Sequence, residues 1–278
     1  MNDPNHVTVR NLAKQRVKLT RRQFFGIMGV FGAGTGALCG GLTASSLLAT
    51  RVIVTTPTDA PIPIPTVTTP IVEKPPVVDR ATWGALSPNI NARNEKGYYN
   101  KLDNPEGWYV YPNRLQDSYQ TLVIHHSAFY EEDGLSTLAE VQRAHHEDRG
   151  WADVGYHFMI DKDGTIYEGR DLTVRGAHVS GYNTGSAGVC LFGDFRFEAP
   201  PQAQMDALYA LNDWLVFRLE LTHLTGHQQF NDWTECPGTL LISQLEDIAT
   251  RAGLIFGTDG YVSSARASGC GCGCQTTV

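Results

Sequence analysis

The sequence is poor in cysteine and in net positive charge for its length. Six cysteines among 278 residues are too few for a small scaffold held by disulfide bonds. Lysine and arginine total 22 against 29 aspartates and glutamates, and the formal charge of −7 argues against general affinity for nucleic acid. Internal repeats are also absent. Because 42% of the residues are apolar and 18% are charged, the chain can bury a sizeable core and is not wholly disordered.

The charge is divided unevenly along the chain. Residues 1–26 carry six basic side chains and one acid, a net charge of +5. The remaining 252 residues carry 16 basic and 28 acidic side chains, a net charge of −12. A short basic leader followed by a long acidic part indicates that the two parts have different roles.

A stretch without any charged residue follows the basic leader. From Gln23 to Thr50 there are 28 uncharged residues, of which seven are glycine, and the paired arginines Arg21 and Arg22 stand just before them. A basic segment, paired arginines and a glycine-rich apolar run resemble a twin-arginine export signal, a route for proteins that are already folded. We therefore expect residues 1–50 to direct export across the cytoplasmic membrane, to a periplasmic or extracellular location.

An uncleaved segment is the alternative to a removed signal. The 28 uncharged residues exceed the ~20 that span a bilayer, so they also fit a membrane anchor. Ala44 and Ala49 are small-residue candidates for cleavage, but a clean Ala-x-Ala site is absent. A lipoprotein is disfavoured, because Leu38 before Cys39 is too large for good lipid attachment. Contact with a membrane is expected only through this N-terminal segment.

Proline and threonine dominate the next segment. Residues 55–78 hold seven of the fourteen prolines in the chain, together with six threonines. Proline fixes φ and lacks an N–H group, which favours an extended spacer. We expect residues 51–78 to form a linker that holds a folded domain away from the membrane-proximal segment.

The C-terminal residues have a composition that cannot form a core. Residues 257–278 are rich in glycine and place cysteines at alternating positions, Cys270, Cys272 and Cys274. We expect a disordered, dispensable tail. Three thiols with this spacing also suit a soft metal or intermolecular disulfides after export.

Residues 79–256 are expected to form a single folded domain. Apolar, β-branched runs predict strands, with a hairpin turn at Asp161–Gly164. Helices are predicted after the capping box of Thr137 and Glu140, after Pro201, and at the end of the domain. The predicted strands cover 121–125, 156–160, 165–168, 187–192 and 221–225, and the last helix covers 241–252. Because strands and helices mix without strict alternation, we expect an α/β (mixed α+β) fold, with a central mixed sheet flanked by helices on both faces.

Eight of the nine histidines lie between residues 125 and 227. His125 and His126 end the first predicted strand. Because successive side chains on a strand point to opposite faces, at most one of the pair can serve a given site. Ligands approach an open sheet at the ends of its strands, although a hydrogen-bonded structural histidine is equally compatible with this position. His145 lies on the apolar face of a predicted helix and is expected in the core, whereas His146 is expected to be exposed.

His227 and Cys236 follow the last predicted strand and are separated by eight residues. Imidazole and thiolate ligands suit zinc. The spacing differs from the paired C-x2-C patterns of structural zinc sites, and ligands drawn from distant segments would leave a fourth position open, as in catalytic sites. Cys190, in contrast, falls within a predicted buried strand and is interpreted as core packing.

A series of short motifs occurs in one order and covers about residues 79–250. The motifs are Arg80–Ala85, Val123–Ala128, Gly150–Phe158, Asp163–Arg170, Gly176–His178 with Gly181–Asn183, and Thr234–Gly238. This series resembles the zinc-dependent N-acetylmuramoyl-L-alanine amidases, in the branch shared by bacteriophage lysozyme-type amidases and peptidoglycan recognition proteins. The resemblance implies the mixed α/β fold of the peptidoglycan recognition proteins.

The resemblance also implies roles for individual residues. Two histidines and one cysteine hold the zinc ion in this family, and these positions fall on His125, His227 and Cys236. The catalytic tyrosine falls on Tyr156. The family has lysine or threonine two residues before the cysteine, and this chain has Thr234, whose neutral hydroxyl would orient groups through hydrogen bonds.

Further family positions line the substrate groove. They fall on His178 and Asn183, and both residues are equally compatible with hydrogen bonds that order their own loop. Trp151 is expected in the core rather than on the floor of the groove. The chain departs from the family in one place, because the gap between the second zinc-binding histidine and the cysteine is one residue longer. We expect this insertion, within residues 228–233, to bulge outward.

The implied reaction is hydrolysis of the amide between N-acetylmuramic acid and L-alanine in peptidoglycan or muropeptides, by a monomer. Zinc would lower the pKa of a bound water from ~15.7 toward ~7, and Tyr156 would stabilise the oxyanion, orient the water or pass on a proton. The competing interpretation is a module that binds peptidoglycan without cutting it, although such members typically lack the cysteine that Cys236 supplies. A phage-type lytic role is a second alternative, and the export segment argues against it.

Overall fold

The computed structural model describes residues 72–259 and Tyr261. The expected export signal or anchor (residues 1–50), the first part of the expected linker and the cysteine-containing tail lie outside the described residues. The described part contains every residue to which the family resemblance gives a role. Within it, no helix combines the length and the apolar character that a membrane span requires.

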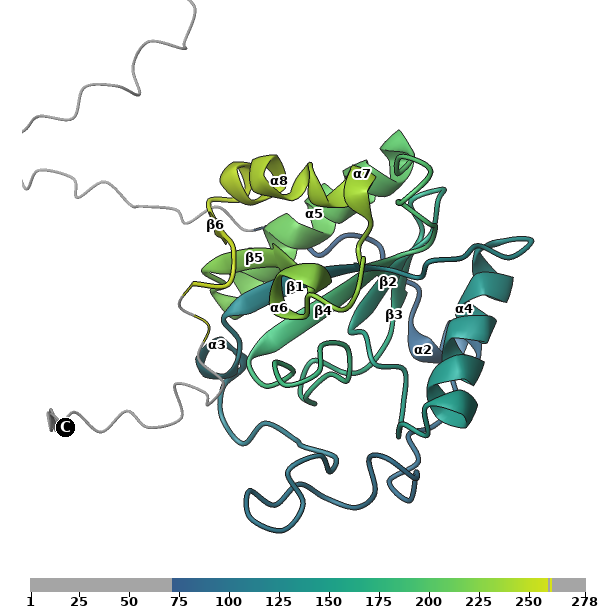
Figure 1. Ribbon diagram of the computed structural model, residues 1–278, viewed down its shortest axis with the longest axis vertical. Coiled ribbons are helices and arrows are strands. Elements are labelled where there is room, and N and C mark those ends of the chain that lie inside the picture. The colour runs from purple at the N-terminus through teal and green to yellow at the C-terminus, as the bar shows by residue number, and fades with distance from the viewer. Residues whose placement is uncertain (1–71, 260, 262–278) are drawn as a thin grey trace, which may run out of the picture. The chain divides into compact units, whose positions relative to one another are not determined.

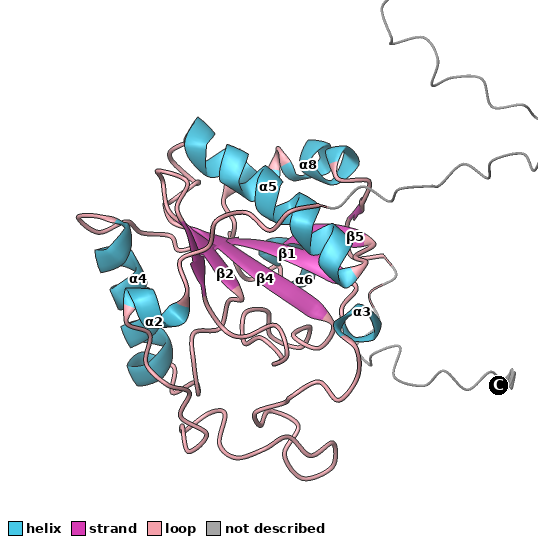
Figure 2. Cartoon of the chain, turned by 180° about the vertical axis from the view of Figure 1, so that it is seen from behind, coloured by secondary structure: helices cyan, strands magenta, loops and turns pink. Residues whose placement is uncertain are grey.

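One six-stranded sheet forms the centre of the domain, in the order β3-β2-β4-β1-β5-β6 (Figures 1 and 2). Its strands are β1 (Thr121–His126), β2 (Phe158–Ile160), β3 (Ile166–Glu168), β4 (Ser186–Leu191), β5 (His223–Gly226) and β6 (Ile255–Phe256). The β2–β3 hairpin is antiparallel, and every other neighbouring pair is parallel. The predicted mixed sheet is therefore confirmed, and its hairpin turns at Asp161–Gly164 as expected.

The larger hydrophobic core lies between the sheet and three helices. These helices are α5 (Gln202–Leu219), α7 (Thr239–Ile242) and α8 (Leu245–Arg251). Their leucines and isoleucines form one buried cluster with Leu122 and Ile124 of β1. Figure 2 shows α5 and α8 side by side over this face of the sheet.

The opposite face of the sheet packs against α4 (Gly134–Arg143). Leu138 and Val141 of this helix form a second cluster with Cys190 of β4. Helices on both faces were predicted and are confirmed. Since side chains alternate along β1, His125 belongs to the face of α4 rather than to that of α5. Short helices complete the domain: α2 (Arg80–Trp83), α3 (Leu115–Ser118) and α6 (His227–Phe230).

The N-cap of α4, Asp133, stands four residues before the predicted cap, Thr137. The Asp133 carboxylate accepts a hydrogen bond from the Ser136 amide at 2.7 Å and caps the helix. The Thr137 hydroxyl donates instead to the Asp133 carbonyl at 2.8 Å, and Glu140 pairs with Arg143. The predicted capping box of Thr137 and Glu140 is therefore wrong, because aspartate caps a helix more strongly than threonine and stands one turn earlier.

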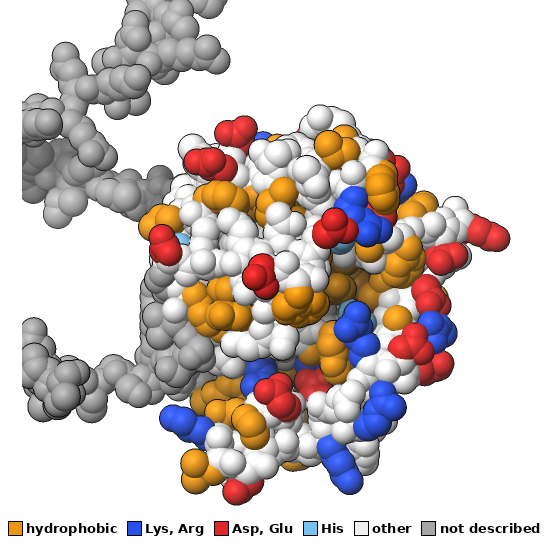
Figure 3. Space-filling model, viewed as in Figure 1, with side chains coloured by type: hydrophobic (Ala, Val, Ile, Leu, Met, Phe, Trp, Pro, Cys, Tyr) orange, Lys and Arg blue, Asp and Glu red, His pale blue; other side chains and the backbone are white. Residues whose placement is uncertain are grey.

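The outer surface of α4 carries charges of both signs, which stand side by side in Figure 3. Arg143 contacts three acids, Glu140, Glu147 and Asp148, at 2.7 to 3.7 Å. Exposed ion pairs contribute roughly 0–1 kcal/mol each. The helix is therefore held in place mainly by its buried apolar face.

A π-helix at Ala144–Asp148 continues α4. Its wide turn buries His145, as predicted, and the His145 Nδ1 accepts a hydrogen bond from the Gly155 amide at 3.0 Å. His146 is also mostly buried, with 12% of its side chain exposed, so the predicted exposure is wrong. The reason is packing against Asp153, whose carboxylate lies 3.9 Å from the His146 Nε2.

The predicted last helix is two helices, α7 and α8, separated by Ser243 and Gln244. Leu241 and Leu245, which lie on either side of this break, are both fully buried in the larger core.

The packed domain extends past both of its expected boundaries. Val77 and Val78 pack against the core, and the Val78 amide donates to the Ile166 carbonyl at 2.8 Å. At the other end, Tyr261 contacts the rings of Tyr182 and Phe230. Part of the expected linker and the start of the expected tail are thus built into the domain.

Candidate metal centre and its cavity

Three possible metal ligands from distant segments meet at one edge of the sheet. His125 lies near the end of β1, His227 follows β5 directly, and Cys236 lies in the loop before α7. One ligand atom from each residue lies within 4.8 Å of the other two, and the Cys236 Sγ is 3.6 Å from the His125 Nδ1. The carboxyl ends of neighbouring parallel strands meet at this edge, which explains why the sheet topology assembles the cluster.

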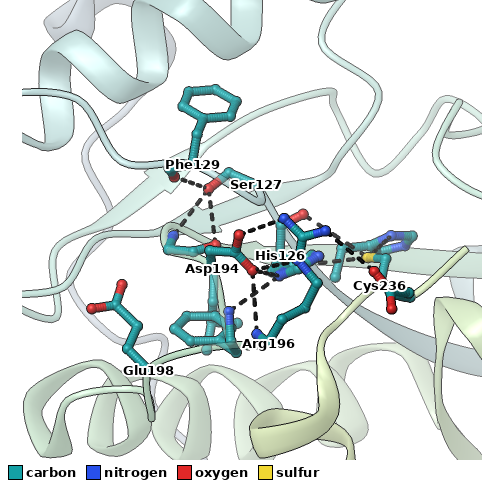
Figure 4. A network of polar contacts seen from close by, with 12 residues as sticks. His126, Ser127, Phe129, Asp194, Arg196, Glu198 and Cys236 are labelled. Atoms are coloured by element: carbon teal, nitrogen blue, oxygen red, sulfur yellow. Dashed lines mark hydrogen bonds and ion pairs between the residues drawn. The ribbon is translucent and has the colours of Figure 1, made fainter.

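His126 points to the opposite side of β1 from His125. Its Nδ1 accepts a hydrogen bond from the Phe195 amide at 3.3 Å and lies 3.9 Å from the Asp194 carboxylate (Figure 4). The backbone amide of His126, however, donates to the Cys236 Sγ at 3.4 Å. As alternation along the strand predicts, only one histidine of the pair joins the cluster.

The loop that carries Cys236 is held from both sides. The Cys236 carbonyl accepts from the Gln228 amide at 2.7 Å, and the Cys236 amide donates to the Thr234 hydroxyl at 3.2 Å. Arg196, paired with Asp194, also reaches the Glu235 carboxylate at 3.2 Å (Figure 4). These bonds fix the direction of the thiol, and they show that the Thr234 hydroxyl orders the loop.

His178 stands directly behind His125. The His178 Nδ1 is 3.0 Å from the His125 Nε2, and the His178 Nε2 is 3.3 Å from the Ser186 carbonyl. A carbonyl only accepts hydrogen bonds, so the network assigns the proton to the His178 Nε2. The His178 Nδ1 then accepts from the His125 Nε2, which leaves the lone pair of the His125 Nδ1 facing Cys236.

Gly188 makes room for this arrangement. A Cβ atom at position 188 would lie 2.6 Å from the His178 ring, closer than real carbon contacts come. The strand β4 therefore needs glycine here so that the imidazole can approach the sheet.

Burial keeps the cluster uncharged in the absence of a cation. It lowers the pKa of His125 well below its usual range, with His178 and His227 contributing, and it lowers the pKa of His227 to about 4. Burial also raises the pKa of the Cys236 thiol to about 12. The His227 Nε2 is buried and has no hydrogen-bond partner among the described residues. The unpartnered nitrogen of His227 lies beside the His125 imidazole and the Cys236 thiol. Together these atoms form a ligand set that suits a borderline-soft cation.

Tyr156 lies beside the cluster. Its ring centroid is 5.0 Å from that of His125 and 5.3 Å from that of His145. Burial raises the pKa of the Tyr156 hydroxyl well above its usual value, and Cys190 and Cys236 add to the effect. The phenol is therefore neutral at physiological pH and able to donate a hydrogen bond.

A cavity opens next to the cluster. Its lining includes two predicted groove residues, His178 and Asn183, together with His227 of the cluster. Asn183 also orders its loop, because its carboxamide oxygen accepts hydrogen bonds from the amides of His178 and Val179, both at 2.8 Å. Asn183 therefore both lines the cavity and orders its own loop, which are the two roles that the sequence left open. The ring nitrogens of His178 are engaged by His125 and Ser186, which leaves other parts of the residue for the cavity wall.

Sequence reasoning missed several cavity residues. Trp151 was expected in the core, but it is half-buried and lines the cavity. The Arg149 guanidinium lies 5.1 Å from the Trp151 ring and lines the same wall, and Trp233 lines the wall near His227. Asp232 and Trp233 are exposed, in agreement with an outward bulge of this loop. Neither Arg149 nor Trp233 has a spacing that marks it as functional, so only the folded arrangement identifies them.

The far wall of the cavity is fixed by a buried ion pair. Arg170 forms two hydrogen bonds with the Glu95 carboxylate, at 2.5 and 2.9 Å, and both side chains are buried. The same carboxylate accepts from the Ala152 amide at 2.9 Å. Because Glu95 itself lines the cavity, this pair holds a long irregular segment in the position that closes the site.

Two pocket loops are joined on their outer side by three aromatic rings. Tyr182 stacks on Phe230 with their centroids 4.5 Å apart, and Tyr261 packs edge-on against both. The Tyr261 hydroxyl donates to the Thr184 carbonyl at 2.6 Å. Tyr182 adjoins Asn183, and Phe230 belongs to the short helix that starts at His227, so the cluster links both walls of the cavity.

The fold is expected to lose stability in mild acid because of His157. Burial lowers the pKa of this fully buried imidazole from 6.5 to about 4. Below pH 6.5 the unfolded chain binds a proton that the folded chain excludes, so stability falls as the pH drops from about 6.5 to about 4, by up to about 3 kcal/mol. Urea unfolding at pH 7 and pH 5 measures the loss. His157→Asn, which keeps an acceptor for the Gly188 amide, should make the dependence shallower, while the other buried histidines with a lowered pKa, such as His227, keep part of it. An equal slope in both proteins would contradict the assignment.

Comparison with known proteins gives one family match and several similar proteins. Residues 115–239 match a family described as N-acetylmuramoyl-L-alanine amidase. The chain is 39% identical over 132 residues to peptidoglycan-recognition protein LB of Drosophila melanogaster, which covers 45% of this chain and 56% of that protein. It is 35% identical over 130 residues to peptidoglycan-recognition protein SC2 of the same species, covering 44% of this chain and 70% of that protein.

A bacteriophage protein is similar over a shorter stretch. The endolysin of Klebsiella phage KP32 is 49% identical over 74 residues, which cover 25% of this chain and 49% of the endolysin. The matched region thus spans about half the length of the LB protein and of the endolysin.

Proposed function

The chain belongs to the family of N-acetylmuramoyl-L-alanine amidases and peptidoglycan-recognition proteins, and we propose that it is a zinc-dependent amidase. The substrate is peptidoglycan or a muropeptide derived from it, and the bond cleaved is the amide between N-acetylmuramic acid and L-alanine. The observation that carries the proposal is the meeting of His125, His227 and Cys236 within 4.8 Å, beside Tyr156 and an open cavity.

His125, His227 and Cys236 would hold the zinc ion. The donor set of two neutral imidazoles and one thiolate, with a buried and unpartnered Nε2 on His227, fits zinc. Three protein ligands leave a position for water or substrate, as in catalytic rather than structural sites. When bound, zinc supplies a Lewis acid that polarises a carbonyl and lowers the pKa of water.

The remaining residues orient the substrate and stabilise charge. The neutral Tyr156 hydroxyl donates a hydrogen bond to the oxygen on which negative charge develops, a contribution of about 3–4 kcal/mol for a well-placed donor. Thr234 contributes by keeping the Cys236 loop in place. Arg149 on the cavity wall offers a cation to the carboxylates of a stem peptide.

His178 is expected to tune metal affinity through His125. Replacing it with leucine removes the acceptor for the His125 Nε2–H group, and the affinity for zinc should fall by about 10–100-fold. His178→Asn places an oxygen close to the former Nδ1 and should recover much of this loss. Titration of zinc against a competing chelator measures both variants. Wild-type affinity in His178→Leu would show that the contact has no such role.

Muropeptide digestion tests the proposed activity. Purified protein and cell-wall sacculi are incubated with and without a chelator, and the products are identified by mass spectrometry. Release of free stem peptide that stops in chelator and returns with zinc supports the proposal. Binding of sacculi without any release would identify a non-catalytic peptidoglycan-binding module instead, and cleavage at a sugar linkage would refute the amidase.

We further propose that the enzyme acts outside the cytoplasm. Residues 1–50 would direct its export by the twin-arginine route, and the proline-rich residues that follow would serve as a spacer. Replacing Arg21 and Arg22 with lysines should retain the protein in the cytoplasm, which fractionation of cells measures.

A further inference from the structure

Trp233 is a large aromatic side chain that is exposed to solvent at the edge of the cavity. Its exposed fraction is 70%, although it lines the same cavity as His227. The two rings meet edge to face, with centroids 5.7 Å apart and planes at 82°. Because most of its surface is exposed, the indole is available to a ligand beside the candidate metal centre.

Hydrogen bonds anchor the backbone on both sides of this ring. On one side of Trp233, the Asn231 amide donates to the His227 carbonyl at 3.1 Å. On the other side, the Thr234 hydroxyl accepts from the Cys236 amide at 3.2 Å. A loop with an anchored backbone loses little backbone freedom on binding, which favours its use as a contact surface.

The other walls of the cavity have a different character. They carry charged groups of both signs, among them Glu95, Glu106, Arg149 and Arg175. Their tryptophan, Trp151, is half-buried and has the Arg149 guanidinium over its ring, whereas Trp233 is exposed. A stem peptide carries carboxylates and amino groups, whereas the muramyl ring is an uncharged pyranose that offers C–H groups on its face. The two halves of a muropeptide lie on either side of the scissile amide. The charged walls therefore match the peptide, and the aromatic edge next to His227 matches the sugar.

We propose that Trp233 is the stacking platform for the muramyl pyranose and selects substrates that still carry the sugar. This inference rests on the proposed amidase function and assigns a substrate group to one residue of that site. Loss of this ring removes the apolar surface that the sugar would bury against it, so binding should weaken roughly tenfold.

Two matched substrates test this assignment. One is an N-acetylmuramyl peptide, and the other is the same peptide carrying only the lactyl group on its L-alanine. In Trp233→Ala, the ratio of kcat/KM for the first substrate to that for the second should fall about tenfold, mainly through KM. Trp233→Tyr, which keeps an aromatic face, should restore most of the ratio. Phe217→Ala removes an exposed aromatic ring from α5, outside the cavity, and should leave the ratio unchanged.

The outcomes separate this proposal from the amidase function itself. If the wild-type protein cleaves neither substrate, the amidase proposal fails, and calorimetric binding of the two compounds to wild type and Trp233→Ala then tests the platform alone. An equal loss on both substrates, or no loss on either, would overturn the role of Trp233 in binding sugar.

Discussion

Replacing Cys236 with serine is expected to abolish tight zinc binding and amide hydrolysis together. The thiolate is the only anionic member of the cluster of His125, His227 and Cys236, and a hydroxyl does not ionise to replace it at neutral pH. Loss of a residue that merely orients a ligand weakens metal binding by about 10–100-fold, so loss of a ligand should exceed ~100-fold. Metal content after dialysis and release of stem peptide measure the two effects.

Cys190 supplies the matched control. It is a second buried thiol, placed beside His125 by the register of β1 and β4, but it is not part of the cluster. Cys190→Ser should retain zinc and differ from wild type mainly in stability. Full amidase activity in Cys236→Ser, or equal zinc loss in both variants, would show that the assigned ligand set is wrong.

The second large effect is expected on stability. Glu95→Gln keeps the shape of the side chain but leaves the fully buried Arg170 without its counter-charge. An uncompensated buried charge typically costs about 3–5 kcal/mol, a large share of the stability of a domain. Urea unfolding at neutral pH measures the change. Because Glu95 also lines the cavity, we expect weaker substrate binding at temperatures where the variant stays folded.

Glu106→Gln is the control for this prediction. Glu106 lines the same cavity and loses the same charge, but it is exposed rather than buried. Its replacement should change the free energy of unfolding by no more than about 0.5 kcal/mol. Similar destabilisation in both variants would mean that the charge of the cavity, and not the buried pair, supports the fold.

The sequence predicted those features that depend on local pattern. The buried run before His125 predicted β1, and simple alternation along a strand correctly placed His125 and His126 on opposite sides. The antiparallel hairpin followed from its turn residues in the same way. Local pattern misplaced the start of α4, because both Asp133 and Thr137 are residue types that cap helices and the structure uses Asp133.

Several contacts between distant segments were not predicted, although the family resemblance implied that His125, His227 and Cys236 share one site. The contact between His178 and His125 joins residues 53 positions apart and needs Gly188 to open space on a third segment. Trp151 looked like a core residue because aromatic side chains are usually buried, and only the packing around the π-helix exposes it to the cavity. Periodicity does not report such arrangements, since they arise from how elements pack.

The ring of Tyr261 has a practical consequence for anyone who shortens this protein. All the recognisable motifs end at Gly238, so a fragment designed from them could stop soon after the last strand, β6. Such a fragment would lack Tyr261, whose ring packs against both Tyr182 and Phe230. It would keep every proposed catalytic group, yet the two loops of its cavity would have lost an outer support. A fragment meant for assays or crystals should therefore continue beyond residue 261, with any tag separated from that point by a spacer.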